Sequence, residues 1–305
     1  MSTESPKDYQ RLLQELPSDW WRASHKIEVL TGWFRRYLIG LFVEFQDGKE
    51  LRPFMFSGFL LEYRNRLLWA TAGHVIDQLI ELLENTNLSI KTMRWADNYS
   101  VRGAESIPMH HRDLQNLSVS FTHFGIDFGF VFLIGLDREN ILRNDRINIM
   151  SMKGWQNLQF SNPEGYYILG YPRQLEKVEK GIVRDGRVLK VFEAMPTCLP
   201  IIRIPYRSEF SQTLFWNDPD AFYGHIEPFS DGSLHQFSDI DGMSGGPILS
   251  IERTNAGEIK YRLFGIQRSW EQDEGIIRAE PIQRVIAHLD LILDAWEAFT
   301  EQDEL

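Results

Sequence analysis

The sequence has almost no cysteine and no long apolar run. Its 305 residues include one cysteine, Cys198, so no disulfide can form within the chain. No apolar stretch reaches the roughly 20 residues that a helix needs to span a bilayer. The polar start, residues 1–8, lacks the apolar core of a signal peptide. Together these absences predict a protein of the reducing cytoplasm with no membrane partner.

Positive charge is also scarce. The 32 lysines and arginines are outnumbered by 43 aspartates and glutamates, which gives a net charge of −11. Because phosphate binding requires clustered basic residues, nucleic acid is not an expected partner. Cys198 has no basic neighbour in the sequence, so we expect a small semi-buried residue at this position, not a reactive thiol.

The chain does contain many short strand-like segments. Apolar, β-branched and aromatic runs alternate with turn signals such as Asp47-Gly48 and Asp185-Gly186. An amphipathic helix is predicted for residues 281–299, with a proline in its first turn. The pattern predicts a mainly β fold of two barrels or sandwiches.

We divide the chain into four segments on this pattern. They are an N-terminal helical extension (1–34), a first β-barrel (35–155), a second β-barrel (156–280) and a C-terminal helix (281–305). The long connection 173–240 has two interpretations, an elaboration of the second barrel and a lid or partner-docking surface.

One serine lies among three glycines in the segment Asp241–Pro247. Gly242, Gly245 and Gly246 permit backbone angles closed to other residues, and they let a substrate carbonyl approach main-chain N–H groups. Ser244 is therefore a candidate nucleophile. Taken alone, a glycine-rich turn with an incidental serine is the ordinary alternative.

Two further segments place ionisable groups at the ends of strand-like runs. His74 follows Trp69–Gly73, where small residues leave room for an imidazole and a substrate. Asp127 opens the apolar run Phe128–Ile134, where an unpaired carboxylate costs ~3–5 kcal/mol. A histidine N–H can be its partner. Taken singly, a core histidine and a turn-capping aspartate are the alternatives.

The three segments occur in the order His, Asp, Ser, which is the chymotrypsin order. They resemble motifs of trypsin-like serine proteases: Thr71-Ala72-Gly73-His74 resembles Thr-Ala-Ala-His, Gly242–Pro247 resembles Gly-Asp-Ser-Gly-Gly-Pro, and Asp127–Leu133 resembles Asp-Ile-Ala-Leu-Leu. Three more segments are similar to motifs of the HtrA-like branch: Phe56-Ser57-Gly58-Phe59, Ile168–Pro172 and Phe264-Gly265-Ile266. The resemblance covers residues 37–280.

This resemblance implies a mainly β, chymotrypsin-like double β-barrel with an active site between the barrels. It implies a serine endopeptidase in which Ser244 is the nucleophile, His74 the general base, and Asp127 the residue that orients His74. The N–H groups of Gly242 and Ser244 would form the oxyanion hole. The implied substrate is a protein or peptide, and no cofactor or metal is expected.

The resemblance also suggests a substrate pocket. Ser238 and Asp239 would lie near its base, and Gln267 and Arg268 along the edge that pairs with the substrate. Trp270 stands where the family often has a glycine, so its indole would narrow or close the pocket.

Regulation is expected to differ from that of trypsin. Met243 replaces the aspartate that pairs with a newly cut N-terminus in trypsin, so activation by N-terminal cleavage is not expected. An unregulated cytoplasmic protease would be toxic. We therefore expect a latent chain, with the Gly242 amide turned away from the oxyanion position until a regulatory protein partner or a ligand binds.

Three other functions are considered. A protease-fold module that binds peptides or a protein partner without cutting is the main alternative. The Gly-x-Ser-x-Gly elbow of α/β-hydrolases would need a histidine after the serine, where only His288 qualifies. A metal site at His110, His111 and His123 is disfavoured because the helical His-Glu-x-x-His spacing is missing.

Overall fold

The computed structural model describes residues 30–96, 107–109, 111–122, 126–144, 147–151, 163–184, 187–207, 218–226, 239–253, 259–272 and 274–302. Its elements in chain order are η2 (Arg35–Tyr37), β1 (Gly40–Asp47), β2 (Glu50–Phe56), β3 (Phe59–Tyr63), β4 (Arg66–Thr71), α3 (Gly73–Glu84), β5 (Leu88–Ala96), β6 (Ile107–Pro108), α4 (His111–Leu117), β7 (Ser118–Phe121), β8 (Phe128–Leu133), α5 (Gly135–Leu142), β9 (Met150–Ser151), β10 (Gly165–Gly170), η3 (Arg173–Leu175), β11 (Glu176–Arg184), β12 (Arg187–Ala194), β13 (Thr197–Arg203), β14 (Phe222–Ile226), β15 (Pro247–Arg253), β16 (Ile259–Glu271), β17 (Ile276–Pro281) and α7 (Ile282–Gln302).

The second half of the chain forms a closed antiparallel barrel. Its strand order is β10-β13-β14-β17-β16-β15, with β15 returning to β10. Closure leaves no unpaired strand edge in this sheet. One apolar cluster of the barrel consists of Tyr166, Ile168, Leu199, Ile201, Phe222, Ile240, Met243, Ile248, Phe264, Ile277 and Ala279.

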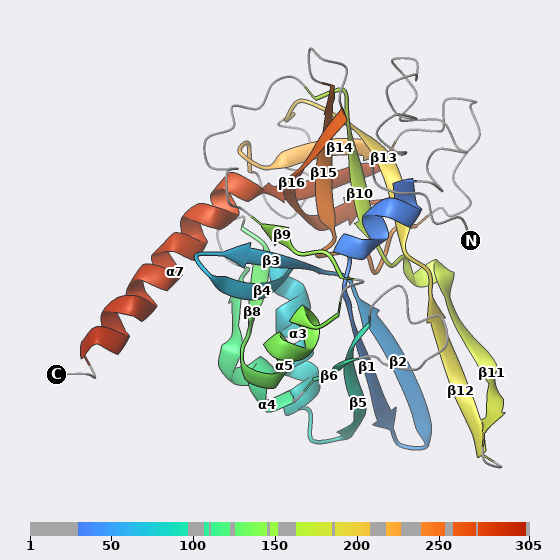
Figure 1. Ribbon diagram of the computed structural model, residues 1–305. Helices are drawn as coiled ribbons and strands as arrows, with labels where there is room; N and C mark the ends of the chain where they lie inside the picture. Colours follow the sequence, from blue (N-terminus) through green and yellow to red (C-terminus); the bar gives the residue numbers. More distant parts are fainter. Residues whose placement is uncertain are drawn as a thin grey trace.

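Part of the connection 173–240 belongs to this barrel. Two of its strands, β13 and β14, complete the closed sheet, in agreement with the interpretation as an elaboration of the second barrel. The pattern of β13 is hard to recognise because Pro200 stands in its middle, where it pairs with Tyr167. The hairpin β11–β12 projects from the barrel along the first half (Figure 1).

The first half consists of two packed sheets. Their strand orders are β2-β1-β5-β6 and β7-β8-β4-β3-β9. Side chains of both sheets share one apolar cluster, which includes Leu41, Val43 and Trp95 from the first sheet and Leu60, Trp69 and Val131 from the second. The predicted fold class was a mainly β, chymotrypsin-like double β-barrel; the mainly β fold is confirmed, and its arrangement in two β units is consistent with that prediction. In strand pairing, only the second unit is closed.

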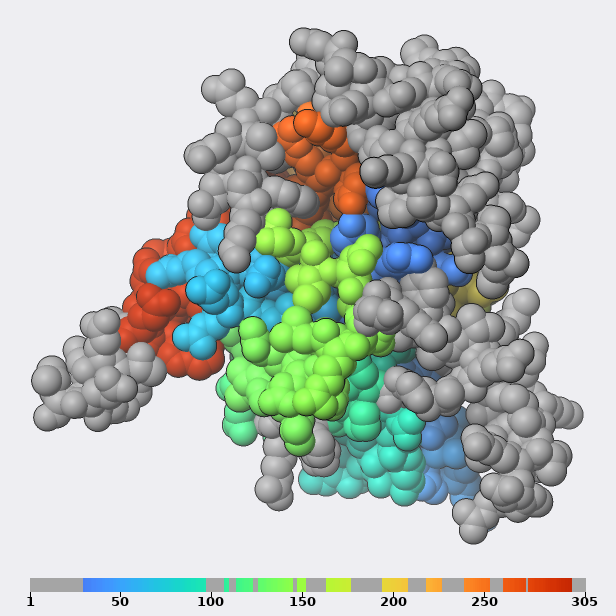
Figure 2. All heavy atoms as spheres, in the orientation of Figure 1, coloured from blue at the N-terminus to red at the C-terminus, as the bar shows by residue number. Residues whose placement is uncertain are grey.

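The helix α7 lies along the junction of the two halves and runs past the first (Figure 1). A shared apolar cluster joins Leu68 and Phe130 of the first half, Tyr167 and Leu263 of the second, and Leu289 of α7. The predicted amphipathic helix is thus confirmed, and Figure 2 shows it projecting from one side of the molecule. In the described part of the chain, no helix has both the length and the apolar character needed to cross a membrane.

The predicted segment boundaries fall mostly outside the described residues. β9 pairs with β3 of the first half, and β10 belongs to the second barrel. The change from one half to the other therefore falls between residues 151 and 165, and the predicted boundary at 155/156 stays a prediction. Of the predicted N-terminal extension, only residues 30–34 are described, and they are helical.

Candidate active site

His74 and Asp127 come from adjacent elements of the first half. His74 lies in the first turn of α3, just after β4 ends, and Asp127 directly precedes β8, which pairs with β4. Asp127 Oδ2 is 2.8 Å from His74 Nδ1. The backbone N–H of His74 donates to Asp127 Oδ1 at 2.9 Å. Both carboxylate oxygens therefore contact His74.

This carboxylate also stabilises the start of α3. The first amides of a helix have no partner within the helix, and the N-cap residue Ala72 supplies no side-chain hydrogen bond. Asp127 accepts one of these amides and places negative charge at the positive end of the helix. A proton on His74 Nδ1, donated to Asp127, leaves Nε2 as a free acceptor. The pair is thus arranged as a base whose ring is fixed.

Ser244 lies on a tight loop of the second half. Gly242 has φ +92° and Gly245 φ +90°, angles that side chains disfavour. Within the loop, Met243 N–H donates to Ile240 O at 3.0 Å, and Gly246 N–H to Met243 O at 2.9 Å. The Ser244 side chain is partly exposed, whereas Met243 is fully buried.

Two amides of this loop are left free. Among the described residues, the N–H groups of Gly242 and Ser244 form no hydrogen bond, whereas their neighbours in the loop do. The carbonyl of Asp241 accepts the N–H of Arg173 at 2.7 Å. Because a trans peptide is planar, the Gly242 N–H points the opposite way. Both the turned-away amide expected for a latent chain and latency itself stay predictions.

The Ser244 loop packs against the residues that precede His74. A Cβ added at Gly245 would collide with Thr71 Oγ1 and lie 2.8 Å from the Ala72 nitrogen. Only Gly73 separates Ala72 from His74, so the structure brings the loop and the histidine into one region. No hydrogen bond joins Ser244 to His74 in the part of the chain described. Catalytic hydrogen bonds are often long in sites without substrate.

The residues predicted for a substrate pocket lie in different environments. Ser238 is outside the described residues. Asp239 Oδ1 accepts the N–H of Asp241 at 2.8 Å, so this carboxylate supports the turn before the loop. Gln267 is buried, its carbonyl accepts the N–H of Gly245 at 2.8 Å, and its Oε1 has no partner in the described structure.

Arg268 and Trp270 contact the interior of the protein. The Arg268 side chain has no exposed surface, and its Nη1 lies 2.8 Å from Glu280 Oε2 and 3.4 Å from Asp218 Oδ2. Its guanidinium therefore forms buried ion pairs and does not line an open pocket. Trp270 is partly buried and packs on the apolar cluster that contains Met243 of the Ser244 loop.

Two residues outside the predicted set contact the Ser244 loop. Arg173 holds the Asp241 carbonyl and also pairs with the Asp241 carboxylate, Nη1 to Oδ2, at 2.7 Å. Ser57 Oγ donates to the Gly242 carbonyl at 2.7 Å. Ser57 lies in one of the segments that resemble the HtrA-like branch, and Arg173 directly follows another. The sequence motifs thus include or adjoin both residues, but they do not indicate which groups these residues contact.

The α/β-hydrolase alternative and a reactive Cys198 lack the required arrangement. His288 packs edge-on against Phe121 and Phe128, and Pro247 opens a strand where an α/β-hydrolase elbow requires a helix. Cys198 is fully buried, and burial raises the pKa of its thiol far above the usual range, which prevents a nucleophilic role. The described residues contain no cluster of three potential metal ligands. The side chains of His110, His111 and His123 are outside the described structure.

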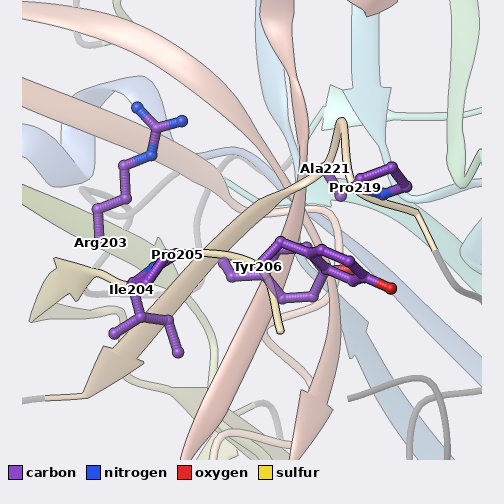
Figure 3. A pocket seen from close by; sticks show the side chains of 7 residues that line it. Arg203, Ile204, Pro205, Tyr206, Pro219 and Ala221 are labelled. Atoms are coloured by element: carbon purple, nitrogen blue, oxygen red, sulfur yellow. The ribbon is translucent and has the colours of Figure 1, made fainter. Parts of the chain in front are cut away.

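A separate hollow lies on the second barrel. Its volume is about 350 Å³, and Figure 3 shows it between the end of β13 and the start of β14. The lining residues are Arg203, Ile204, Pro205, Tyr206, Pro219, Ala221 and Tyr223. None of the candidate catalytic residues lines it, so we do not assign it to the active site.

Comparisons with known proteins do not assign this chain to a family. No protein-family model and no curated protein matches it. Among solved structures, the chain is similar to the Rv3671c protease from M. tuberculosis in its active form, with 11% sequence identity, a TM-score of 0.41, and coverage of 88% of this chain and 86% of that one. A likeness this distant supports no functional argument. The strand pairing of this chain establishes a mainly β fold with a closed six-stranded barrel.

Proposed function

We propose that the protein is a serine endopeptidase with Ser244, His74 and Asp127 as its catalytic triad. The observation that carries the proposal is that Asp127 contacts both the backbone N–H and the ring Nδ1 of His74. These contacts lie beside the loop that carries Ser244. The two free amides of that loop belong to Gly242 and Ser244, the pair that an oxyanion hole requires.

The proposed chemistry follows from these positions. A substrate draws Ser244 Oγ and His74 Nε2 together, and Nε2 removes the hydroxyl proton as Oγ attacks the peptide carbonyl. Asp127 keeps the ring oriented and stabilises its positive charge. The amides of Gly242 and Ser244 bind the oxyanion. Nε2 then protonates the leaving amine, and a water molecule activated by the same nitrogen hydrolyses the acyl-enzyme.

Replacement of the nucleophile is the direct test. We expect Ser244→Ala to lower kcat on an unstructured protein substrate ~10⁴-fold or more while the fold is kept. Covalent labelling by a fluorophosphonate probe should disappear with it. Ser250→Ala is the matched control, because Ser250 is a buried serine of the adjacent strand whose hydroxyl has no partner among the described residues. Residual activity of Ser244→Ala above about one part in 10³ would reject the assignment.

One observation favours a different function, a module that binds peptides without cutting them. Ser244 and His74 form no hydrogen bond in the described structure. Labelling of the wild-type chain at Ser244 by the fluorophosphonate would exclude this alternative, and failure to label would favour it. Cytoplasmic location and latency remain predictions, and cleavage of casein by the purified chain without an added factor would contradict latency.

A further inference from the structure

Ser57 is a fully buried serine between β2 and β3 of the first half. Its hydroxyl forms two hydrogen bonds to the second half. Ser57 Oγ donates to the carbonyl of Gly242 at 2.7 Å and accepts the N–H of Tyr171 at 2.9 Å. One hydroxyl therefore joins the loop of the proposed nucleophile to the end of β10.

The backbone of Ser57 also contacts both parts of the proposed site. Its carbonyl accepts the hydroxyl of Thr71 at 2.8 Å, at the end of the strand that leads to His74. A Cβ added at Gly245 would lie 2.6 Å from the same carbonyl oxygen. Ser57 thus lies between the strand that positions the histidine and the loop that carries Ser244.

The peptide groups on either side of Gly242 are each held through their carbonyl. Arg173 N–H binds the Asp241 carbonyl at 2.7 Å, and Ser57 Oγ binds the Gly242 carbonyl. Glycine itself imposes little on the backbone, since it adopts positive and negative φ about equally well. The Gly242 N–H belongs to the peptide that Arg173 holds, and Ser57 holds the peptide on the other side of the same Cα. The orientation of this N–H, at φ +92°, therefore depends on both contacts.

We propose that Ser57 is a positioning residue that fixes the oxyanion amide of Gly242 from across the junction of the two halves. The inference rests on the proposed function, because an oxyanion hole has meaning only if Ser244 attacks a carbonyl. Ser57 is not itself catalytic, because its hydroxyl is hydrogen-bonded to two backbone groups of the protein.

The expected effect follows from how such a site works. An oxyanion hole accelerates the reaction because its donors are aimed before the charge develops. Without the Ser57 hydroxyl, the Gly242 carbonyl loses its donor and the buried Tyr171 N–H loses its acceptor. The peptide between Gly242 and Met243 is then held from one side, by the bond of the Met243 N–H to Ile240 O, so the Gly242 Cα can shift. The Gly242 N–H lies on the other side of this Cα and is then correctly aimed for only part of the time. Contacts that bind the uncharged substrate do not depend on this amide.

The test is the variant Ser57→Ala with steady-state kinetics. We expect kcat to fall about 10–100-fold with KM unchanged, a smaller loss than the ~10²–10³ that follows outright removal of an oxyanion donor. The affinity for a peptide boronic acid, whose tetrahedral adduct occupies the oxyanion hole, should fall in parallel. The affinity for an uncharged, non-cleavable peptide that lacks a terminal carboxylate and the pH profile of kcat should not change.

Two further variants separate positioning from folding. Ser250→Ala removes a buried hydroxyl that has no partner among the described residues, and it should keep wild-type kcat and boronate affinity. Should Ser57→Ala fail to fold in a thermal melt, Ser57→Cys replaces it. The thiol occupies the same position but donates only weakly, so the same loss confined to kcat is expected.

The outcomes distinguish this inference from the proposed function. An active wild type with an unchanged kcat in the Ser57 variant, or with a loss that appears in KM, overturns the role of Ser57 and leaves the triad in place. A folded wild type that neither hydrolyses peptides nor reacts with a fluorophosphonate overturns the proposed function, and the positioning role with it.

Discussion

The two halves of the molecule hold two carboxylates, Asp127 and Glu280, in opposite ways. Asp127 in the first half is 20% exposed, and its partners are two N–H groups of one residue, His74. Glu280 in the second half has no exposed surface. It pairs with two guanidinium groups, Arg268 Nη1 at 2.8 Å and Arg284 Nη1 at 2.9 Å.

This difference in environment predicts that Asp127 serves the proposed chemistry and that Glu280 serves the stability of the fold. A buried carboxylate surrounded by full positive charges cannot exchange protons with a substrate, and removing it leaves an uncompensated charge in the interior. A carboxylate that binds one imidazole at the edge of the protein leaves the other ring nitrogen free to accept and return a proton. Two substitutions test whether the two sites divide these roles, and a third tests a partly buried carboxylate near the Ser244 loop.

The largest effect is expected for Asp127→Asn. The asparagine oxygen can still accept the backbone N–H of His74, so the fold and the start of α3 are kept. Its NH₂ group would face Nδ1 and force the proton onto Nε2, which prevents general-base catalysis. We expect kcat to fall about 10⁴-fold, as when a triad aspartate is replaced by asparagine. Peptide hydrolysis and a thermal melt measure the two effects, and an unchanged kcat would contradict the role of Asp127.

A large loss of stability is expected for Glu280→Gln. The substitution removes the buried charge that both Arg268 and Arg284 contact and leaves Asp218 to pair with the two guanidinium groups. The free energy of unfolding should therefore fall by up to about 3–5 kcal/mol. The matched control is Glu297→Gln, because Glu297 is 49% exposed and pairs with Arg64 at 2.9 Å. Exposed ion pairs contribute about 1 kcal/mol or less. Denaturant unfolding measures both variants, and equal losses would show that burial does not distinguish these pairs.

The smallest effect is expected at Glu176, the residue after η3 and close to the Arg173–Asp241 pair. Burial, with a further contribution from the charge of Asp241, raises the pKa of Glu176 from 4.5 to about 7. Between these values the unfolded chain has lost a proton that the folded chain still binds. This residue therefore lowers stability as pH rises from about 4.5 to 7, and its contribution is constant above 7.

Glu176→Gln removes this dependence. The melting temperature of the variant, compared with that of the wild type, should rise across the same pH window. Glu50→Gln is the control, since Glu50 is 73% exposed and should show no such trend. A difference between Glu176→Gln and wild type that stays constant from pH 4.5 to 8 would contradict the raised pKa.

The sequence indicates the parts of the candidate site that lie in short contiguous motifs. His74, Asp127 and Ser244 each stand among neighbours that carry the signal themselves. The Ser57 contact joins residues 185 positions apart, so no local pattern reports it. Arg268 was expected along a substrate edge, but the strand pairing shifts between Gln267 and Ser269. This bulge breaks the alternation of side chains and directs Arg268 to buried partners.

The placement of α7 has a consequence for how the molecule is made. Arg284 at its start bonds Asp218 of the second half at 2.8 Å, and Trp296 further along packs on Phe132 of the first. This helix follows every other described element in the chain, so the ribosome releases it after both β units. A nascent chain therefore contains all three proposed catalytic residues before α7, which contacts both halves, has emerged. The contacts of α7 that join the two halves can therefore form only after this helix has emerged.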